Sequence, residues 1–66
     1  MKVFCNGQEQ ELTPGARVTD CLNTLGLDPL SVVVECDGKI LTREEYASQE
    51  LQDGSVLELI RFVGGG

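Results

Sequence analysis

The stretch 56-VLELIRFVGGG-66 ends the sequence, and the other residues are arranged around it. An apolar run of strand character extends from Val56 to Val63. Because side chains alternate between the two faces of a strand, Leu57 and Leu59 share one face. We predict that this strand is the longest of the fold and that both leucines lie in its core.

Three glycines, Gly64, Gly65 and Gly66, follow the strand directly. Glycine loses the most backbone entropy when it is fixed, so a terminal run of it favours a mobile tail. Fully extended, three residues reach roughly 10 Å, and without Cβ atoms they fit a channel too narrow for other residues. We therefore divide the chain into a domain over residues 1–63 and a flexible C-terminal tail over residues 64–66. A frayed, linker-like end is the alternative.

The composition points away from nucleic acid and from an enclosed active site. A chain of 66 residues forms one domain. A domain of this size buries only about 60% of its unfolded surface, which leaves little room for a catalytic cavity. Eleven acidic residues against five basic give a net charge of −6, whereas phosphate contacts require clustered Lys and Arg. A basic surface on a protein partner is the natural complement.

Histidine is absent, and the three cysteines, Cys5, Cys21 and Cys36, are widely spaced. The lack of His removes the usual general base and the commonest metal ligand. An odd number of cysteines without a C-x-x-C pair argues against a disulfide framework and a zinc site. We interpret the cysteines as small buried apolar residues, with a reactive thiol as the alternative. We expect no metal and no cofactor bound by this chain.

The sequence also lacks the signals of membrane insertion and export. No stretch approaches the ~18 consecutive apolar residues of a membrane-spanning helix. No signal peptide precedes Met1, and the unpaired cysteines suit a reducing compartment. We therefore expect no membrane partner and a cytoplasmic location.

The first half of the sequence predicts a hairpin followed by a helix. Residues 1–5 form a strand, Asn6-Gly7 is a type I′ turn signal, and residues 8–12 return antiparallel as a polar edge strand. Thr19 is the expected N-cap, and one helical face carries apolar residues at i, i+3, i+4 and i+7. Gly26 is the expected left-handed stop. The four residues of that face are Val18, Cys21, Leu22 and Leu25.

The second half predicts short strands joined by tight turns. Residues 31–36 form a strand, Asp37-Gly38 makes a turn, and residues 39–41 pair back briefly. Asp53-Gly54 makes the last turn before the final strand. We assign both Asp-Gly pairs to turns alone.

A short helical turn lies between these strands. Thr42 starts a capping-box pattern, which predicts that a helix begins there. Tyr46 is expected to pack over this turn rather than to contact a ligand. Arg43 is expected to hold a loop rather than to bind a substrate.

The order of strand, strand, helix, two short strands and strand indicates an α+β domain. We predict a mixed sheet of four to five strands with one helix packed across one face. Phe4, Ile60 and Phe62 then point away from the helix. Clustered beside the tail of a small acidic protein, these three residues form an apolar patch that we predict to bind a partner.

With this element order and glycine end, the chain resembles the β-grasp family that includes ubiquitin. Within that family it is similar to the ThiS-type sulfur carriers of thiamine biosynthesis. The resemblance covers residues 1–66. It is carried by 1-MKV-3 with Asn6-Gly7, by 37-DGKI-40 with Arg43 and Tyr46, and by Asp53-Gly54 with 56-VLE-58 and 62-FVGGG-66, of which the last group is the most specific. Cys36, Thr42 and Ser55 depart from residues frequent in the family, and none of them touches the terminus.

The resemblance implies a carrier and not an enzyme. In this family, an ATP-using enzyme related to the ubiquitin activators adenylates the terminal glycine carboxylate. A cysteine desulfurase or sulfurtransferase supplies sulfur for its conversion to a thiocarboxylate, and a thiazole synthase takes that sulfur. Here the attachment point is Gly66, and Gly64 and Gly65 are the segment that threads the partner's active site. The sequence has no G-x-x-x-x-G-K phosphate loop, so ATP belongs to the partner.

Other functions share this ending. The small subunit of molybdopterin synthase, or another thiocarboxylate carrier, has the same fold and Gly-Gly end, although the approach Phe62-Val63-Gly64 favours the thiamine type. A ubiquitin-like interaction module would use the patch without sulfur chemistry. A protein-conjugating modifier would join its terminus to lysine. Fold analogy alone does not decide among these functions.

Overall fold

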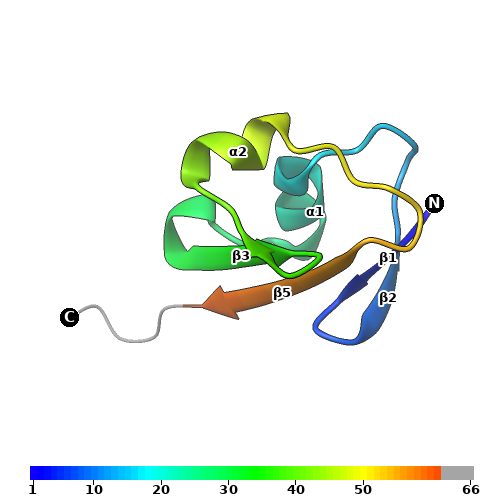
Figure 1. The fold of residues 1–66 in the computed structure, drawn as a ribbon, viewed down its shortest axis with the longest axis horizontal. Coiled ribbons are helices and arrows are strands. Elements are labelled where there is room, and N and C mark those ends of the chain that lie inside the picture. The colour runs from blue at the N-terminus through cyan, green and yellow to red at the C-terminus, as the bar shows by residue number, and fades with distance from the viewer. Residues whose placement is uncertain (62–66) are drawn as a thin grey trace.

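The computed structural model describes residues 1–61, and residues 62–66 lie outside the described part. Within it, strands and short helices follow one another along the chain (Figure 1). They are β1 (Lys2–Cys5), β2 (Gln8–Glu11), α1 (Val18–Leu25), η1 (Pro29–Ser31), β3 (Val32–Cys36), β4 (Lys39–Ile40), α2 (Arg43–Ser48) and β5 (Val56–Arg61).

The strands form one mixed sheet in the order β2-β1-β5-β3-β4. Strand β5 lies at its centre, parallel to β1 and antiparallel to β3. Strand β2 lies at an edge, as its polar sequence predicts. Helices α1 and α2 lie on the same side of the sheet, which we call the inner face (Figure 1). The α+β fold and the mixed sheet are therefore confirmed, and α2 adds a second short helix.

Helix α1 begins earlier than predicted, so the assignment of Thr19 as its N-cap is wrong. Arg17 is the N-cap residue, and its backbone N–H donates to the Asp20 carboxylate at 2.8 Å. Arg17 also forms an isolated antiparallel bridge with Glu50, which lies beyond α2. This pairing holds Arg17 in an extended conformation, so the helix begins at the next residue, Val18. A local sequence pattern does not reveal a partner so far along the chain.

Gly26 ends α1 as predicted. Its φ of 70° lies in the left-handed region, where glycine is favoured, and the Leu27 N–H donates to the Leu22 carbonyl at 2.9 Å. Leu27 thereby turns back against the core. Val18, Cys21 and Leu22 form the buried face of the helix, which leaves Leu25 partly buried.

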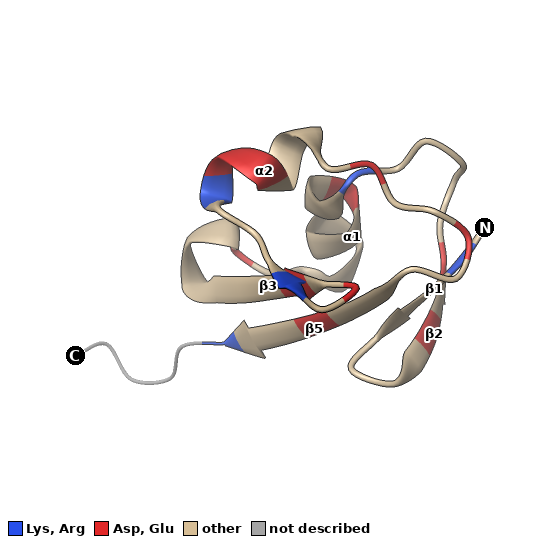
Figure 2. Ribbon diagram, in the orientation of Figure 1, with Lys and Arg blue, Asp and Glu red and all other residues tan. Residues whose placement is uncertain are grey.

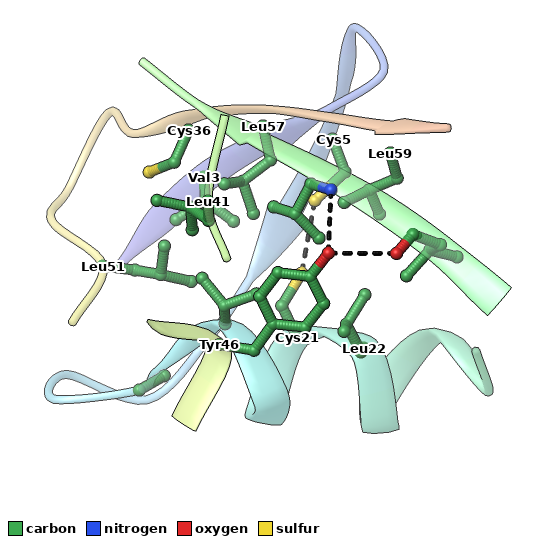
Figure 3. Packing of buried hydrophobic residues seen from close by; sticks show 14 of the residues in the cluster. Val3, Cys5, Cys21, Leu22, Cys36, Leu41, Tyr46, Leu51, Leu57 and Leu59 are labelled. Atoms are coloured by element: carbon green, nitrogen blue, oxygen red, sulfur yellow. Dashed lines mark hydrogen bonds between the residues drawn. The ribbon is translucent and has the colours of Figure 1, made fainter. Parts of the chain in front are cut away.

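Helix α2 begins with the predicted capping box. The Thr42 backbone N–H donates to the Glu45 carboxylate at 2.9 Å, and Thr42 is the N-cap. The Tyr46 hydroxyl donates to the Val32 carbonyl at 3.0 Å and accepts from the Val34 N–H at 3.2 Å (Figure 3). These bonds fix α2 against β3, which confirms that Tyr46 is a packing residue.

Arg43 holds a loop, as predicted. Its guanidinium donates to the carbonyls of Pro29 at 3.3 Å and Leu30 at 2.8 Å. Both carbonyls belong to η1, a short 3₁₀ turn that the sequence analysis did not predict. Asp28 caps this turn, because its carboxylate accepts the Leu30 N–H at 2.9 Å.

Both Asp-Gly turns form, but their carboxylates do more than a turn requires. Asp37 has a φ of 48°, and the glycine after it has a φ of 86°, as a type I′ turn needs. The Asp37 carboxylate accepts the Val56 N–H at 2.9 Å. The Asp53 carboxylate accepts the Lys2 N–H at 2.8 Å. The assignment of these residues to turns alone is therefore wrong, since each also ties the chain to a distant strand.

The core lies between the inner face and the helices (Figure 3). In β5, Leu57 is fully buried and Leu59 is 7% exposed, whereas Ile60 is 56% exposed. The predicted alternation of this strand is thus confirmed.

This alternation has a direct consequence for stability. We expect Leu59→Ala to lower the free energy of unfolding by ~2–5 kcal/mol, the usual cost of truncating a buried leucine. Ile60→Ala, at the next position but on the solvent side, is the matched control and should cost much less. Urea denaturation of both variants measures the difference. Equal losses would show that the two faces of β5 have been exchanged.

Candidate functional site

Strand β5 carries the chain toward the glycines, and its neighbours fix its position. It pairs with β3 along its length and with β1 at Phe4 and Cys5. Beyond the end of β1, the side chain of Asn6 continues the pairing. Its Oδ1 accepts the Leu59 N–H at 2.8 Å, and its Nδ2 donates to the Leu59 carbonyl at 3.3 Å. The Asn6 side chain thus binds the backbone of β5 at Leu59, beyond the point where β1 ends.

The face of the sheet opposite the helices carries many apolar side chains, and we call it the outer face. Strand pairing places Phe4 beside Val56 and Val33 opposite Ile60. Ile40 of β4 lies opposite Glu35 of β3. The apolar residues of the outer face are Phe4, Val33, Ile40, Val56 and Ile60, and its central acidic residues are Glu35 and Glu58.

Two residues of the predicted patch lie on the outer face. Ile60 is 56% exposed and Phe4 is half-buried. They are not adjacent, because Phe4 lies beside Val56, which is about 13 Å from Ile60 along β5 at ~3.3 Å per residue. Phe62, the third member, lies outside the described residues.

Two further residues of this face are exposed and were not among the predicted patch residues: Val56 at 46% and Ile40 at 67%. The alternation that placed Ile60 outward also places Val56 outward, so that signal was present. For Ile40 no such signal existed, because β4 is only two residues long.

Two glutamates interrupt the apolar surface. Glu35 lies directly opposite Glu58 across the β3–β5 pair. Side chains in such pairs start about 4.5–5.5 Å apart at Cβ, and like charges there repel. In the part of the chain that the structure describes, neither carboxylate has an ion-pair partner. Figure 2 shows acidic residues along the sheet as well as on α2. A cationic side chain of a partner would relieve this repulsion.

All three cysteines are buried, as predicted, with exposed fractions of 5% for Cys5, 1% for Cys21 and 7% for Cys36. Burial, followed by the contact with Cys5, raises the pKa of the Cys21 thiol to about 12. Burial and then the charge of Asp37 raise the pKa of the Cys36 thiol. Both groups are therefore protonated and weakly nucleophilic at neutral pH. At these two positions, the alternative of a thiol that reacts as a thiolate at neutral pH finds no support.

The raised pKa of Cys21 predicts a loss of stability in alkali. Below the ordinary thiol pKa of 9.0, both the folded and the unfolded chain hold this proton. Above it the unfolded chain releases the proton and the folded chain keeps it, so stability falls as pH rises toward about 12. Denaturation curves should show a decline of at most about 1.4 kcal/mol per pH unit from this group. Cys21→Ala should flatten the decline, and an unchanged pH profile would refute this origin.

Two further observations concern the described residues. No three His, Cys, Asp or Glu side chains among residues 1–61 gather as a metal site requires. No helix in that part of the chain is long and apolar enough to cross a bilayer. The predicted attachment point Gly66 and threading residues Gly64 and Gly65 lie outside residues 1–61, so their roles stay predictions.

Solved structures with related sequences share this fold. The crystal structure of thiamine biosynthesis protein ThiS from Geobacter metallireducens matches with a TM-score of 0.83 and 30% identity, over the whole of both chains. An NMR structure of a thiamine biosynthesis protein from the same organism matches with a TM-score of 0.80 and 30% identity, and covers all of this chain and 88% of that one.

Sequence relatives extend the comparison. Sulfur carrier protein ThiS of Bacillus subtilis (strain 168) is 39% identical over 49 residues, 74% of each chain. Two proteins named thiazole synthase match all 66 residues, at 36% identity in Paramagnetospirillum magneticum and 32% in Magnetococcus marinus. This chain spans only 20% of the length of each of those two. The model of the ThiS family matches residues 3–66, and the chain therefore belongs to the ThiS family.

Proposed function

We propose that this protein carries sulfur on the carboxylate of Gly66 for thiazole formation in thiamine biosynthesis. The observation that carries the proposal is the ThiS family match, which spans both the sheet domain and the three glycines. The likeness to sulfur carrier protein ThiS of Bacillus subtilis supports it. The protein acts as a co-substrate, and its partners supply catalysis.

The chemistry requires activation of the carboxylate. A chain-terminal carboxylate has a pKa of ~3.5, so it is ionised at neutral pH and is a poor electrophile. An adenylating enzyme joins it to the AMP part of ATP and releases pyrophosphate, which creates a leaving group. The persulfide sulfur of a cysteine desulfurase or sulfurtransferase then attacks the carbonyl carbon, and AMP leaves. A second thiol of the partner enzymes breaks the S–S bond of the resulting acyl disulfide, so that a thiocarboxylate and a disulfide of the partner remain.

The burial of the cysteines supports the carboxylate as the sulfur site. A protein carries activated sulfur either on a thiol, as a persulfide, or on a carboxylate. Each of the three thiols is at most 7% exposed, so a donor enzyme has little access to them. Gly64 and Gly65, which have no side chains, suit the passage of Gly66 into a partner's active site.

The outer face is the surface that we expect to dock the adenylating enzyme, with Phe4, Ile60 and Phe62 as its apolar contacts. Ile60 is 56% exposed and lies on β5, so docking there would aim the glycines at the partner. The facing pair Glu35 and Glu58 favours a partner that brings a basic side chain to the centre of this face.

Thiazole synthase is the partner that we propose to accept the sulfur. Two proteins of that name contain a segment that matches this chain over its full length. A domain fused to an enzyme in one polypeptide commonly takes part in that enzyme's reaction. If this protein and thiazole synthase are separate chains, they must bind each other through an interface for the same transfer to occur.

A transfer assay tests which pathway uses the sulfur. The thiocarboxylate form of the protein is mixed with purified thiazole synthase and its small-molecule substrates, and in parallel with a molybdopterin synthase large subunit and its precursor. We expect thiazole product in the first reaction and none above background in the second. Transfer only to the molybdopterin precursor would assign the protein to molybdopterin synthesis. Transfer in neither reaction would show that the protein donates sulfur in neither pathway.

A further inference from the structure

Two of the cysteines meet in the core. Cys5 is the last residue of β1 and faces the helices, and Cys21 lies in the middle of α1. Their Sγ atoms are 3.3 Å apart, although the residues are 16 positions apart in the sequence (Figure 3). The side chains are 5% and 1% exposed, and both thiols are free.

We propose that Cys5 and Cys21 form an oxidisable dithiol, which a small peroxide converts into a disulfide between β1 and α1. A disulfide requires the sulfur atoms to approach by about 1.3 Å, to the usual length of about 2.0 Å. Small rotations of two side chains supply such a movement, and the sulfurs already face each other. Cys36 is not part of this pair, since its Sγ instead contacts the Asp37 carboxylate at 3.8 Å.

The burial of the pair selects the oxidant. Glutathione disulfide is a bulky peptide and has no path to thiols that are at most 5% exposed, whereas hydrogen peroxide is close to water in size. The Cys5 sulfur, the more exposed of the two, attacks one oxygen of the peroxide and the O–O bond breaks. The departing hydroxide takes the proton that the Cys5 thiol gives up, so a sulfenic acid and one water form. The Cys21 sulfur then displaces hydroxide from the Cys5 sulfur, its proton leaves with that hydroxide as water, and the S–S bond forms. Two thiols and one peroxide thus give one disulfide and two waters.

The bond would strengthen the fold. It would close a loop of about 15 residues and join the helix layer to the sheet, which restricts the unfolded chain. For a domain of this size, a bond of this kind raises the thermal midpoint by about 10 °C or more. Both side chains point to the inner face, away from the outer face. The inference therefore does not depend on the proposed sulfur chemistry.

Peroxide treatment of the reduced protein tests the proposal. After hydrogen peroxide and removal of the excess, thiols are counted in denaturant, and the unreduced digest is mapped by mass spectrometry. We expect the count to fall from three to one, a peptide pair joined through Cys5 and Cys21, and a raised midpoint that dithiothreitol reverses.

Two variants serve as controls. Cys36→Ala should still form the joined peptide pair and show the raised midpoint. Cys21→Ala should form neither, and Cys5→Ala repeats this test in case one of the two variants does not fold. A disulfide that involves Cys36, or three intact thiols under conditions that oxidise the denatured chain, would overturn the proposal. A joined pair without a rise in midpoint would overturn the inferred strengthening of the fold.

Discussion

Removal of Gly65 and Gly66 is expected to abolish acceptance of AMP and sulfur while the fold stays intact. Chain ends contribute few stabilising contacts, and glycine has no side chain to pack into a core. The thermal midpoint and the far-UV circular dichroism spectrum should therefore barely change. Transfer of AMP and sulfur, in contrast, should fall to background, because the terminal carboxylate of the shortened chain cannot extend as far into the partner's active site.

A second form of the protein distinguishes the effect of tail length from the need for a terminal carboxylate. At 66 residues the chain is accessible to chemical synthesis, so it can be made with a C-terminal amide on Gly66. This form has the full length but no C-terminal carboxylate. We expect it to bind the adenylating enzyme and yet to accept neither AMP nor sulfur. Labelled AMP transfer with the purified adenylating enzyme measures all three forms. Transfer to the shortened or the amidated form would show that the carrier proposal is wrong.

Ile60→Glu is expected to leave the protein folded and to weaken its binding to the adenylating enzyme sharply. Ile60 is 56% exposed, so a polar side chain there removes little core packing. In a complex the same position would be buried, and loss of a central apolar contact typically costs ~2 kcal/mol or more, a factor of roughly thirty in Kd. Ala47→Glu adds the same charge on the exposed surface of α2 and is the matched control.

Titration of the wild type and both variants at two ionic strengths measures this effect. With a net charge of −6, the wild type should associate faster at low salt if the partner presents basic residues. Equal affinities of the wild type and Ile60→Glu would show that the outer face does not bind the adenylating enzyme. The glycine tail would then be the protein's only proposed recognition element.

Local patterns predicted much of this fold because the deciding interactions are close in sequence. The alternation of Leu57 and Leu59 with exposed neighbours predicted the faces of β5 correctly. Gly26 was placed correctly as a helix end, because the left-handed conformation that the stop requires favours glycine. The same holds for Thr42, whose capping box depends on a residue only three positions later.

Features that depend on distant partners were not predictable in this way. The start of α1 depends on the bridge between Arg17 and Glu50 as well as on Asp20. Asp37 was recognised as a turn residue, but its bond to Val56 of another strand was not. Cys5 and Cys21 were each predicted to be buried, and only the folded arrangement brings their sulfurs to 3.3 Å. At the candidate site, the alternation of side chains along β5 predicted that Ile60 is exposed. That Glu35 and Glu58 face each other could be known only from the register of β3 against β5.

The most direct test of sulfur carriage is the intact mass of the protein after incubation with ATP, cysteine, a cysteine desulfurase and the adenylating enzyme. We predict one replacement of oxygen by sulfur, dependent on every component and located at Gly66 by fragmentation. An unchanged mass, or sulfur located on Cys5, Cys21 or Cys36 instead, would contradict the proposal.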